Sequence, residues 1–291
     1  MFLVTGATGG IGRRVVRLLR QREQSVRAFV RLTSRYSELE HRGAEIFIGD
    51  LLQEKDIQKA SQGVKYAISA HGSDSDALSL DYRANIQLID QAKANGVEHF
   101  VFISVLGADR GYEDAPVFKA KRAVERYLAA SGLNYTILRP SGLASNLLPL
   151  VERFRETGLY LLIGDRKNRT SIVSTDDLAR IIVDSVTVEG ARNKILPVGG
   201  PEILLREDIP RIFGRIFTKE PVIINSPLFV IDGLQSALGL FNPQIQKSLG
   251  TYRTLLANEF FCTKDEIANL EAIFNFQLET LESFLRRYLA V

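Results

Sequence analysis

Near the amino end of the chain, glycines recur at a spacing that suits a phosphate-binding turn. They follow a G-x-x-G-x-x-G pattern between an apolar run at 2–5 and an amphipathic stretch at 11–22. Such a turn lets the backbone approach a pyrophosphate and places the anion at a helix N-terminus. A tight turn without a ligand is the alternative. The dinucleotide interpretation assigns the contacts to Gly6, Thr8, Gly9, Gly10, Ile11 and Gly12.

The end of the second apolar run indicates which dinucleotide is expected. Residues 25–30 are followed by Arg31, and no Asp or Glu stands there to hold a ribose 2′-hydroxyl. A guanidinium suits a 2′-phosphate, so NADP(H) is expected over NAD(H). The alternative for Arg31 is an exposed charge at a strand end.

Two later strand ends are expected to line the same cofactor. An Asp there can accept from the adenine amino group, and small residues leave room for the cofactor to pass. The residues concerned are Asp50, Leu51, Ala70, His71 and Gly72. His71 is either a catalytic base or a loop histidine with both ring nitrogens hydrogen-bonded, and the second role is favoured.

Strand and helix patterns alternate along the first half of the chain. Short apolar runs lie at 2–5, 25–30, 44–48, 64–70, 99–104 and 134–138, and amphipathic stretches at 11–22, 34–42, 55–61, 77–94 and 117–130. This alternation predicts an α/β fold with a Rossmann-type doubly wound parallel sheet of strand order 3-2-1-4-5-6. A ligand is expected at the carboxyl ends of the strands.

Beyond Pro140 the alternation stops. Strand-like pieces are expected at 160–163, 170–173 and 195–198, and helices at 175–186, 205–217, 227–240, 244–257, 263–273 and 277–289. We therefore expect residues 1–140 to form an NAD(P)-binding core. Residues 141–291 are expected to form a smaller C-terminal α+β lobe for substrate or partner, packed on the core as one structural unit.

Composition excludes several classes of protein. The 291 residues carry 37 Lys and Arg against 34 Asp and Glu, a net charge of +3 that does not favour a nucleic-acid partner. Cys262 is the one cysteine, so no intramolecular disulfide can form, and three scattered histidines give no metal-ligand spacing. The sequence shows neither a membrane-spanning run nor a signal-peptide pattern at its start, so a cytoplasmic protein is expected.

Several motifs together resemble one family. The chain is similar to atypical short-chain dehydrogenase/reductases, specifically the NmrA-like, isoflavone-reductase-like branch, and most of all to NAD(P)H-binding proteins of cyanobacteria and plastids. The motifs that carry the resemblance are the loop Thr5–Gly12, Val30-Arg31, Gly49-Asp50-Leu51, Asn85, Phe102-Ile-Ser104, Leu138-Arg139-Pro140, Ser174-Thr-Asp-Asp177 and Val198-Gly-Gly-Pro201.

The resemblance implies roles for residues that spacing does not identify. The family's Tyr-x-x-x-Lys pair falls on Val117-Phe-Lys-Ala-Lys121, so the lysine is present and the phenol is missing. Lys121 is expected to contact the nicotinamide ribose and to assist catalysis, and Ser104 lies close to the family's serine. The backbone facing the nicotinamide amide is implied to be Pro140, Ser141 and Gly142.

Two functions remain open. One is a reductase of an unidentified carbonyl or activated double bond. The other is a non-catalytic NADPH-binding scaffold or assembly factor, for example for a photosynthetic complex, located in the plastid stroma or at the thylakoid surface. The apolar segment 227–241 is a core helix of the second lobe or a face that docks a substrate, a protein or a membrane surface. The five arginines at 13–22 are expected to form a solvated helix face.

Overall fold

The computed structural model describes residues 1–72, 76–112, 115–230 and 243–290. Within these, the chain divides into two compact units: Met1–Arg139 with Thr175–Leu196, and Pro140–Ser174 with Pro197–Val291. The expected boundary near residue 140 therefore differs for one segment, because Thr175–Leu196 groups with the first unit.

The first unit is built on a seven-stranded sheet of order β3-β2-β1-β4-β5-β6-β9. Its elements are β1 (Phe2–Thr5), α1 (Gly10–Gln21), β2 (Val26–Val30), α2 (Ser37–His41), β3 (Glu45–Ile48), α3 (Glu54–Ala60), β4 (Tyr66–Ser69), η1 (Ala77–Arg83), α4 (Ala84–Ala94), β5 (His99–Ile103), α5 (Pro116–Ala130), β6 (Tyr135–Pro140), α7 (Thr175–Asp184), η3 (Glu189–Ala191) and β9 (Lys194–Val198). The strands from β3 to β6 pair in parallel. The predicted fold class and the order 3-2-1-4-5-6 are confirmed, and β9 extends the sheet beyond β6.

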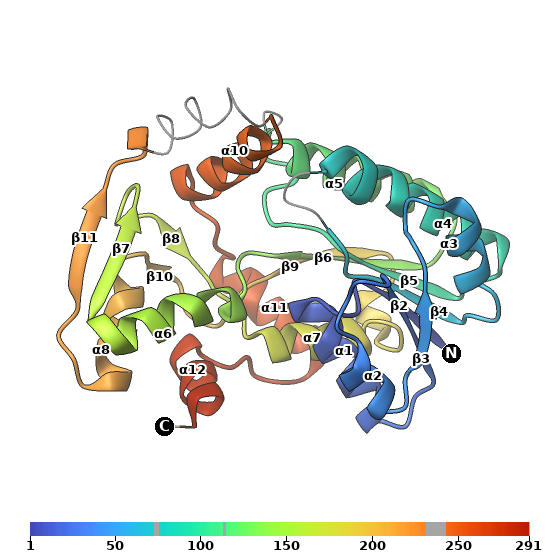
Figure 1. Cartoon of the computed structure of the whole chain (residues 1–291), viewed down its shortest axis with the longest axis horizontal. Helices are drawn as coiled ribbons and strands as arrows, with labels where there is room; N and C mark the ends of the chain where they lie inside the picture. Colours follow the sequence, from blue (N-terminus) through green and yellow to red (C-terminus); the bar gives the residue numbers. More distant parts are fainter. Residues whose placement is uncertain (73–75, 113–114, 231–242, 291) are drawn as a thin grey trace. The chain divides into compact units, whose positions relative to one another are not determined.

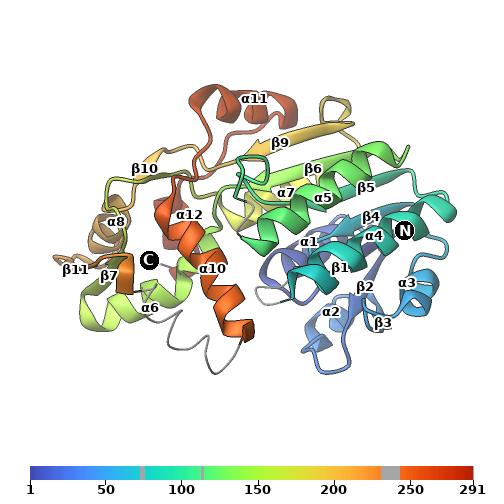
Figure 2. The same cartoon turned by 90° about the horizontal axis from the view of Figure 1, so that it is seen from above.

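Helices cover both faces of this sheet. Figure 1 shows α3, α4 and α5 on one face and α1, α2 and α7 on the other, and Figure 2 gives the same layers from above. Parallel strands buried on both faces read as continuous apolar runs, as β1 does with all four residues buried. In α1 the buried side chains Val15, Val16 and Leu19 recur at helical spacing on one face.

The stretch predicted as one helix over 77–94 begins differently. Ala77–Arg83 is a π-helix, and the α-helical geometry starts at Ala84. Single π-helical turns are rare and recur at functional sites. Here the wider turn carries the fully buried Asp81 and the carbonyl of Leu80.

Three of the five arginines at 13–22 form ion pairs with α7. Arg14 and Arg17 pair with Asp176 at the start of α7, with N–O distances of 2.9 and 3.3 Å. Arg22 pairs with Asp184 at the end of the same helix. These ion pairs join α1 to α7, which explains why residues 175–196 group with the first unit.

The second unit contains η2 (Ala144–Leu147), α6 (Leu148–Thr157), β7 (Leu159–Ile163), β8 (Arg169–Thr170), β10 (Leu204–Leu205), α8 (Asp208–Phe217), β11 (Val222–Ser226), α10 (Pro243–Ala257), α11 (Lys264–Phe274) and α12 (Leu281–Leu289). Two small sheets, β10-β8 and β11-β7, accompany these helices. Sequence patterns did not predict α6 or β11, and β8 is shorter than the predicted strand. The helix predicted over 227–240 lies largely outside the described residues.

Local signals in the second unit have clear structural reasons. A capping box begins α11: Thr263 Oγ1 accepts from the Glu266 N–H, and Glu266 Oε2 accepts from the Thr263 N–H. A Cβ on Gly200 would lie 2.1 Å from the Ile172 carbonyl, and one on Gly199 would lie 2.4 Å from Ser171 Oγ. The Val-Gly-Gly-Pro motif therefore allows close packing on the Ile172 backbone and on the Ser171 side chain.

Candidate cofactor site in the sheet unit

The glycine loop has a geometry that only glycine supports. Gly6 has φ +67°, and a Cβ there would lie 2.5 Å from the Ala70 carbonyl oxygen. A Cβ on Gly12 would lie 2.2 Å from the Gly6 oxygen. The Gly9 N–H donates to that same oxygen at 2.9 Å, which closes the turn. The loop is therefore pressed between β4 and α1, and the α1 N-terminus has no side-chain cap.

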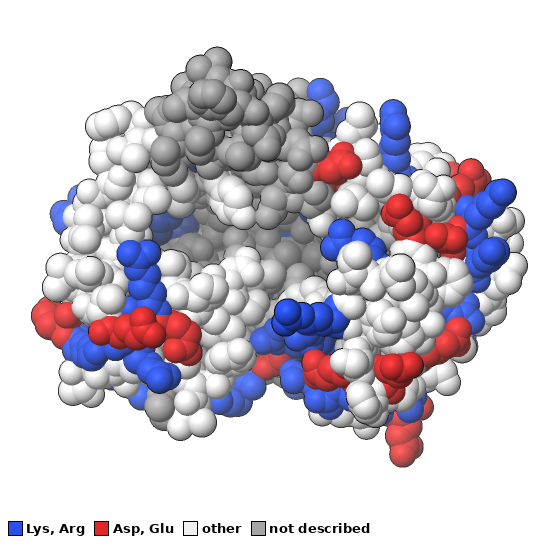
Figure 3. All heavy atoms as spheres, viewed as in Figure 1, with Lys and Arg blue, Asp and Glu red and all other residues white. Residues whose placement is uncertain are grey.

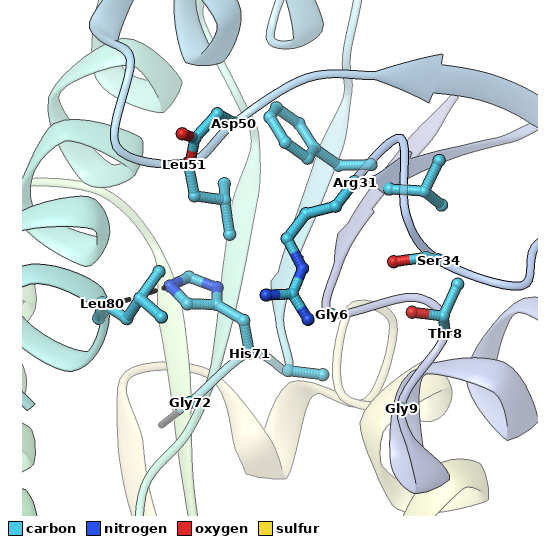
Figure 4. A pocket seen from close by; sticks show the side chains of 13 residues that line it. Gly6, Thr8, Gly9, Arg31, Ser34, Asp50, Leu51, His71, Gly72 and Leu80 are labelled. Carbon is cyan, nitrogen blue, oxygen red and sulfur yellow. Dashed lines mark hydrogen bonds between the residues drawn. The ribbon is translucent and has the colours of Figure 1, made fainter. Parts of the chain in front are cut away.

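A cavity of about 370 Å³ opens beside this loop. Figure 4 shows it from close by. Its lining residues are Gly6, Thr8, Gly9, Phe29, Val30, Arg31, Ser34, Asp50, Leu51, Ala70, His71, Gly72 and Leu80. The strand-end residues expected from the sequence thus surround one space with the glycine loop. The sequence analysis missed Phe29, Val30, Ser34 and Leu80, although Phe29 and Val30 directly precede Arg31. Gly10, Ile11 and Gly12 form the first turn of α1 outside this lining.

Arg31 extends from the end of β2 into the cavity (Figure 4). The hydroxyls of Thr8 and Ser34 lie to one side of its guanidinium. Within the described ranges the guanidinium has no carboxylate or carbonyl partner. A planar cation beside two hydroxyls is suited to a phosphate ester. The chemistry of this donor set fits the 2′-phosphate of NADPH.

Asp50 shapes the turn after β3. Its Oδ1 accepts from the Leu52 N–H at 2.9 Å, and its own N–H donates to Asp56 Oδ2 at 2.9 Å. One carboxylate oxygen is thereby committed to the backbone. Leu51, which follows it, is buried and presents an apolar surface to the cavity. The pair can line a purine base, with Leu51 as the packing surface.

Both ring nitrogens of His71 have a hydrogen-bond partner. Nδ1 lies 2.7 Å from Thr5 Oγ1, and Nε2 lies 3.2 Å from the Leu80 carbonyl. A carbonyl only accepts, so Nε2 carries the proton and Nδ1 accepts from the threonine. Burial, and secondarily the charge of Lys121, lower the pKa of His71 to about 4. His71 is therefore a neutral imidazole in a satisfied network, which does not favour the base role.

Lys121 on α5 brings its ammonium to the Gly72 wall of the cavity. Nζ donates to the Ile103 carbonyl at 2.9 Å and lies 3.5 Å from Asp81 Oδ1. It also lies 5.2 Å from the Phe102 ring centroid. A Cβ built on Gly72 would lie 3.9 Å from Nζ. The absence of a side chain at Gly72 therefore leaves the ammonium close to the cavity wall. Sequence reasoning missed Asp81.

Ser104 lies in a different environment from Lys121. Its Oγ donates to Glu125 Oε1 at 2.6 Å. Glu125 in turn accepts two bonds from Arg139, at 2.8 and 2.7 Å, and Arg139 continues to Asp109. Ser104 is absent from the residues that line the cavity. Its hydroxyl is therefore committed to a buried ion-pair network.

Asn85 connects the end of β4 to the π-helical turn through its side chain. Its side-chain oxygen accepts from Ser69 Oγ at 2.6 Å, and its amide donates to the Asp81 carbonyl at 2.9 Å. Asn85 is fully buried, so these bonds tie β4 to the π-helical turn.

The remaining predicted cofactor residues belong to the second unit. Pro140 ends β6. Ser141 donates through Oγ to the Ser171 carbonyl and through its N–H to the Val198 carbonyl at 3.0 Å. Ser141 and Gly142 line a cavity within that unit.

Comparison with known proteins assigns the chain to a family. A family model described as NAD(P)H-binding matches residues 6–189, which is more than half of the chain and includes every residue that lines the cavity. The chain belongs to this NAD(P)H-binding family. The resemblance to NAD(P)H-binding proteins inferred from the motifs is thereby confirmed, and NAD(P)H is the cofactor.

The relatives that the chain matches include an assembly factor and two reductases. The chain is 27% identical to the photosystem II assembly factor Ycf39 of Cyanophora paradoxa, over 98% of this chain and 91% of that protein. It is 32% identical to an NAD(P)H azoreductase of Xenophilus azovorans, over 70% and 69%. It is 31% identical to a chloroplastic divinyl chlorophyllide a 8-vinyl-reductase of rice, Oryza sativa subsp. indica, over 79% and 62%.

Solved structures share the fold. The triphenylmethane reductase of Citrobacter sp., complexed with NADP(H), superposes with a TM-score of 0.80 at 21% identity, over 98% of this chain and 99% of that one. The NADPH complex of a quinone oxidoreductase of Escherichia coli gives 0.79 at 21% identity, over 99% and 100%. At this identity the likeness shows the fold.

Two further findings bear on ligands and partners. No group of three or more His, Cys, Asp or Glu suited to a metal ion occurs in the described part of the chain. Over the same residues, none of the helices has both the length and the apolar character needed to span a bilayer. Figure 3 shows Lys and Arg side chains interspersed with Asp and Glu on the face drawn.

Proposed function

We propose that this protein is an NADPH-dependent reductase that delivers hydride to a carbonyl or activated double bond. The observation that carries the proposal is the position of Lys121. Its ammonium stands at the Gly72 wall of the cavity that also holds the glycine loop and Arg31. A bound dinucleotide and a proton source would thus share one site.

In this proposal the cavity residues have separate tasks. The glycine loop and the N-terminus of α1, with Gly10, Ile11 and Gly12, bind the pyrophosphate. Arg31, with Thr8 and Ser34, binds the 2′-phosphate and so selects NADPH over NADH. Leu51 packs on the adenine.

Bound NADPH supplies the hydride. Lys121 holds a proton at Nζ and donates it to the substrate atom that gains negative charge, then recovers a proton from solvent. The Ile103 carbonyl and Asp81 fix the direction of the ammonium. With valine at position 117, the phenol of the family's Tyr-x-x-x-Lys pair is missing.

Cofactor selection is tested by calorimetric titration with NADPH and, separately, NADH. Arg31→Ala is expected to weaken NADPH binding about tenfold to a hundredfold, because a charge-assisted contact to a phosphate is worth roughly 1.5–3 kcal/mol. NADH affinity is expected to stay within about twofold, since it lacks the phosphate. Arg35→Ala is the matched control, an exposed arginine on the same loop that does not line the cavity. Equal affinities of the unmodified protein for both cofactors would remove the role of Arg31.

Turnover is tested by NADPH consumption with acceptors of the classes that the relatives' names print: a quinone, an azo dye and a triphenylmethane dye. Lys121→Met is expected to abolish consumption while NADPH remains bound. Lys119→Met, an exposed lysine on the same helix, is expected to leave it unchanged. Undiminished turnover in Lys121→Met would refute the assignment of the proton donor.

A second candidate rests on a different observation. The alignment with the assembly factor Ycf39 runs over nearly the whole of both chains. We propose as the alternative an NADPH-binding protein without turnover that acts in assembling a photosynthetic complex, in contact with a protein or with the surface of a membrane. It predicts tight NADPH binding, no NADPH consumption with any acceptor, and a native complex isolated from the source cells that the non-binding variant Gly6→Ala does not form.

A further inference from the structure

The second unit has its own cavity, whose lining shares no residue with the cavity beside the glycine loop. Its volume is about 500 Å³, within the range of sites that hold small molecules. The wall is mostly apolar and includes Leu150, Leu161, Ile172, Ile209, Ile224 and Phe260.

One side of this cavity is formed by the parallel β7-β11 pair, and side chains on one face of that pair are exposed. In the β7-β11 pair, Val222 is opposite Leu159 and Ile224 is opposite Leu161, so the four side chains share one face. Their exposed fractions are 55, 37, 49 and 54%, in that order. On β7 the intervening Tyr160 is packed inward, with its ring 5.8 Å from that of Phe213 on α8. Parallel sheets are normally covered on both faces, so a ligand over the exposed face would complete the packing.

The lining of this cavity carries positive charge and no carboxylate. Its lining contains Arg153, Arg169 and Arg206 and no acidic residue. Arg169 is neutralised, because Glu259 accepts bonds from its Nε and Nη2 at 2.8 and 2.7 Å.

Arg153 and Arg206, the other two cations of the lining, form no ion pair with a carboxylate of the described residues. The half-buried guanidinium of Arg206 donates to backbone carbonyls of residues 163, 255, 256 and 258, and no carboxylate pairs with it in the described ranges. Arg153 is exposed on α6, three residues from Leu150, and its guanidinium has no partner among the described side chains. A guanidinium in an apolar wall favours an anion that neutralises it.

We propose that this cavity binds an apolar molecule that carries one carboxylate. The apolar body covers Leu159, Leu161 and Ile224, the part of the β7-β11 face that lines the cavity, and the carboxylate is bound by Arg153, with the charge of Arg206 in the same wall. The site goes beyond the proposed reductase function, because its occupation requires neither NADPH nor turnover.

The test uses a fluorescent fatty acid, dansyl-labelled undecanoic acid, and its methyl ester, titrated without NADPH. The acid is expected to bind saturably at one site, and the ester about tenfold more weakly, since it keeps the apolar body and loses the charge. Arg153→Met is expected to weaken acid binding about two- to fivefold, as for an exposed ion pair. Arg153→Lys is expected to keep it. Arg155→Met, on the same helix but outside the lining, is the control.

A second pair of variants tests the sheet face. Leu161→Glu places a carboxylate in the lining at a side chain that is already exposed, so it is expected to abolish acid binding without unfolding the protein. Val222→Glu adds the same charge to the same face outside the lining and is expected to have little effect. Equal affinity for acid and ester, or equal loss in the two glutamate variants, would overturn the proposal.

The outcome is independent of the cofactor site. In Arg31→Ala the acid is expected to bind as in the unmodified protein. Failure of the reductase proposal would leave this binding intact, and failure of acid binding would leave NADPH affinity intact.

Discussion

Removal of the Lys121 ammonium is expected to destabilise the protein before any question of catalysis arises. Lys121 Nζ and Asp81 Oδ1 are 3.5 Å apart, and the side chains are 10% and 0% exposed. Breaking a buried pair by removing one partner costs roughly 3–5 kcal/mol, because the other charged group stays buried and loses this interaction. At about 2–4 °C per kcal/mol for a unit of this size, Lys121→Met should lower Tm by about 6–20 °C.

Removing the charge of Asp81 instead of that of Lys121 should destabilise the protein less. In Asp81→Asn, Lys121 keeps its bond to the Ile103 carbonyl and its position beside the Phe102 ring. We expect a loss of about 1–3 kcal/mol. The double variant Lys121→Met/Asp81→Asn should be more stable than the sum of the single changes predicts, by about 1–3 kcal/mol.

The assay is thermal unfolding of the cofactor-free protein, followed by circular dichroism, for the two single variants and the double variant. Lys119→Met is the matched control and should stay within about 0.5 kcal/mol of the unmodified protein. The reasoning is refuted if Lys121→Met is as stable as this control. It is also refuted if the loss in free energy of unfolding of the double variant equals the sum of the losses of the two single variants. Either result would mean that the pair is solvated.

Three other changes give distinct readouts. Gly6→Ala should abolish NADPH binding and lower the free energy of unfolding by more than about 2 kcal/mol, because it combines a left-handed backbone with a Cβ 2.5 Å from the Ala70 oxygen. The control Gly63→Ala, at φ +69° with no atom within 4 Å of the new Cβ, should lose only the energy of the backbone strain. Between pH 6.5 and pH 4 His71 alone should lower the free energy of unfolding by about 3 kcal/mol, because burial holds its pKa at about 4 while the unfolded chain takes up a proton near 6.5. In His71→Asn, urea unfolding at several pH values should show a shallower loss, with His99, whose pKa is also about 4, accounting for the rest; unchanged slopes would contradict this. Ser104→Ala should lower the free energy of unfolding by about 1 kcal/mol and leave NADPH binding and turnover unchanged, because Glu125 keeps its bonds to Arg139. A large fall in kcat would contradict this and indicate that Ser104 acts in catalysis.

The strand order and the glycine loop were predictable because their signals are local. A strand buried on both faces is a continuous apolar run, and short links between strands and helices leave few possible topologies. Parallel strands also align their carboxyl ends, so residues directly after each run were expected to meet at one edge. Arg31, Asp50, Leu51 and His71 do so.

Other features were not predictable because they depend on contacts between distant residues. Ser104 was expected at the reacting centre, but Glu125, 21 residues away, accepts its hydroxyl. The basic face of α1 was expected in solvent, yet Arg14 meets Asp176, 162 residues away. In each case the decisive partner is absent from the local pattern.

The sequence by itself determined the sheet, the turn that suits a pyrophosphate and the cation at the end of β2, because each is encoded within about a dozen consecutive residues. Only the tertiary structure decided which polar groups are committed and which remain available. It joined Asp81 of the π-helical turn to Lys121, and it left a parallel apolar sheet face beside Arg153 without a balancing carboxylate in the described ranges. Pairing and burial are properties of the packed chain, and they set the chemistry of a side chain as much as its type does.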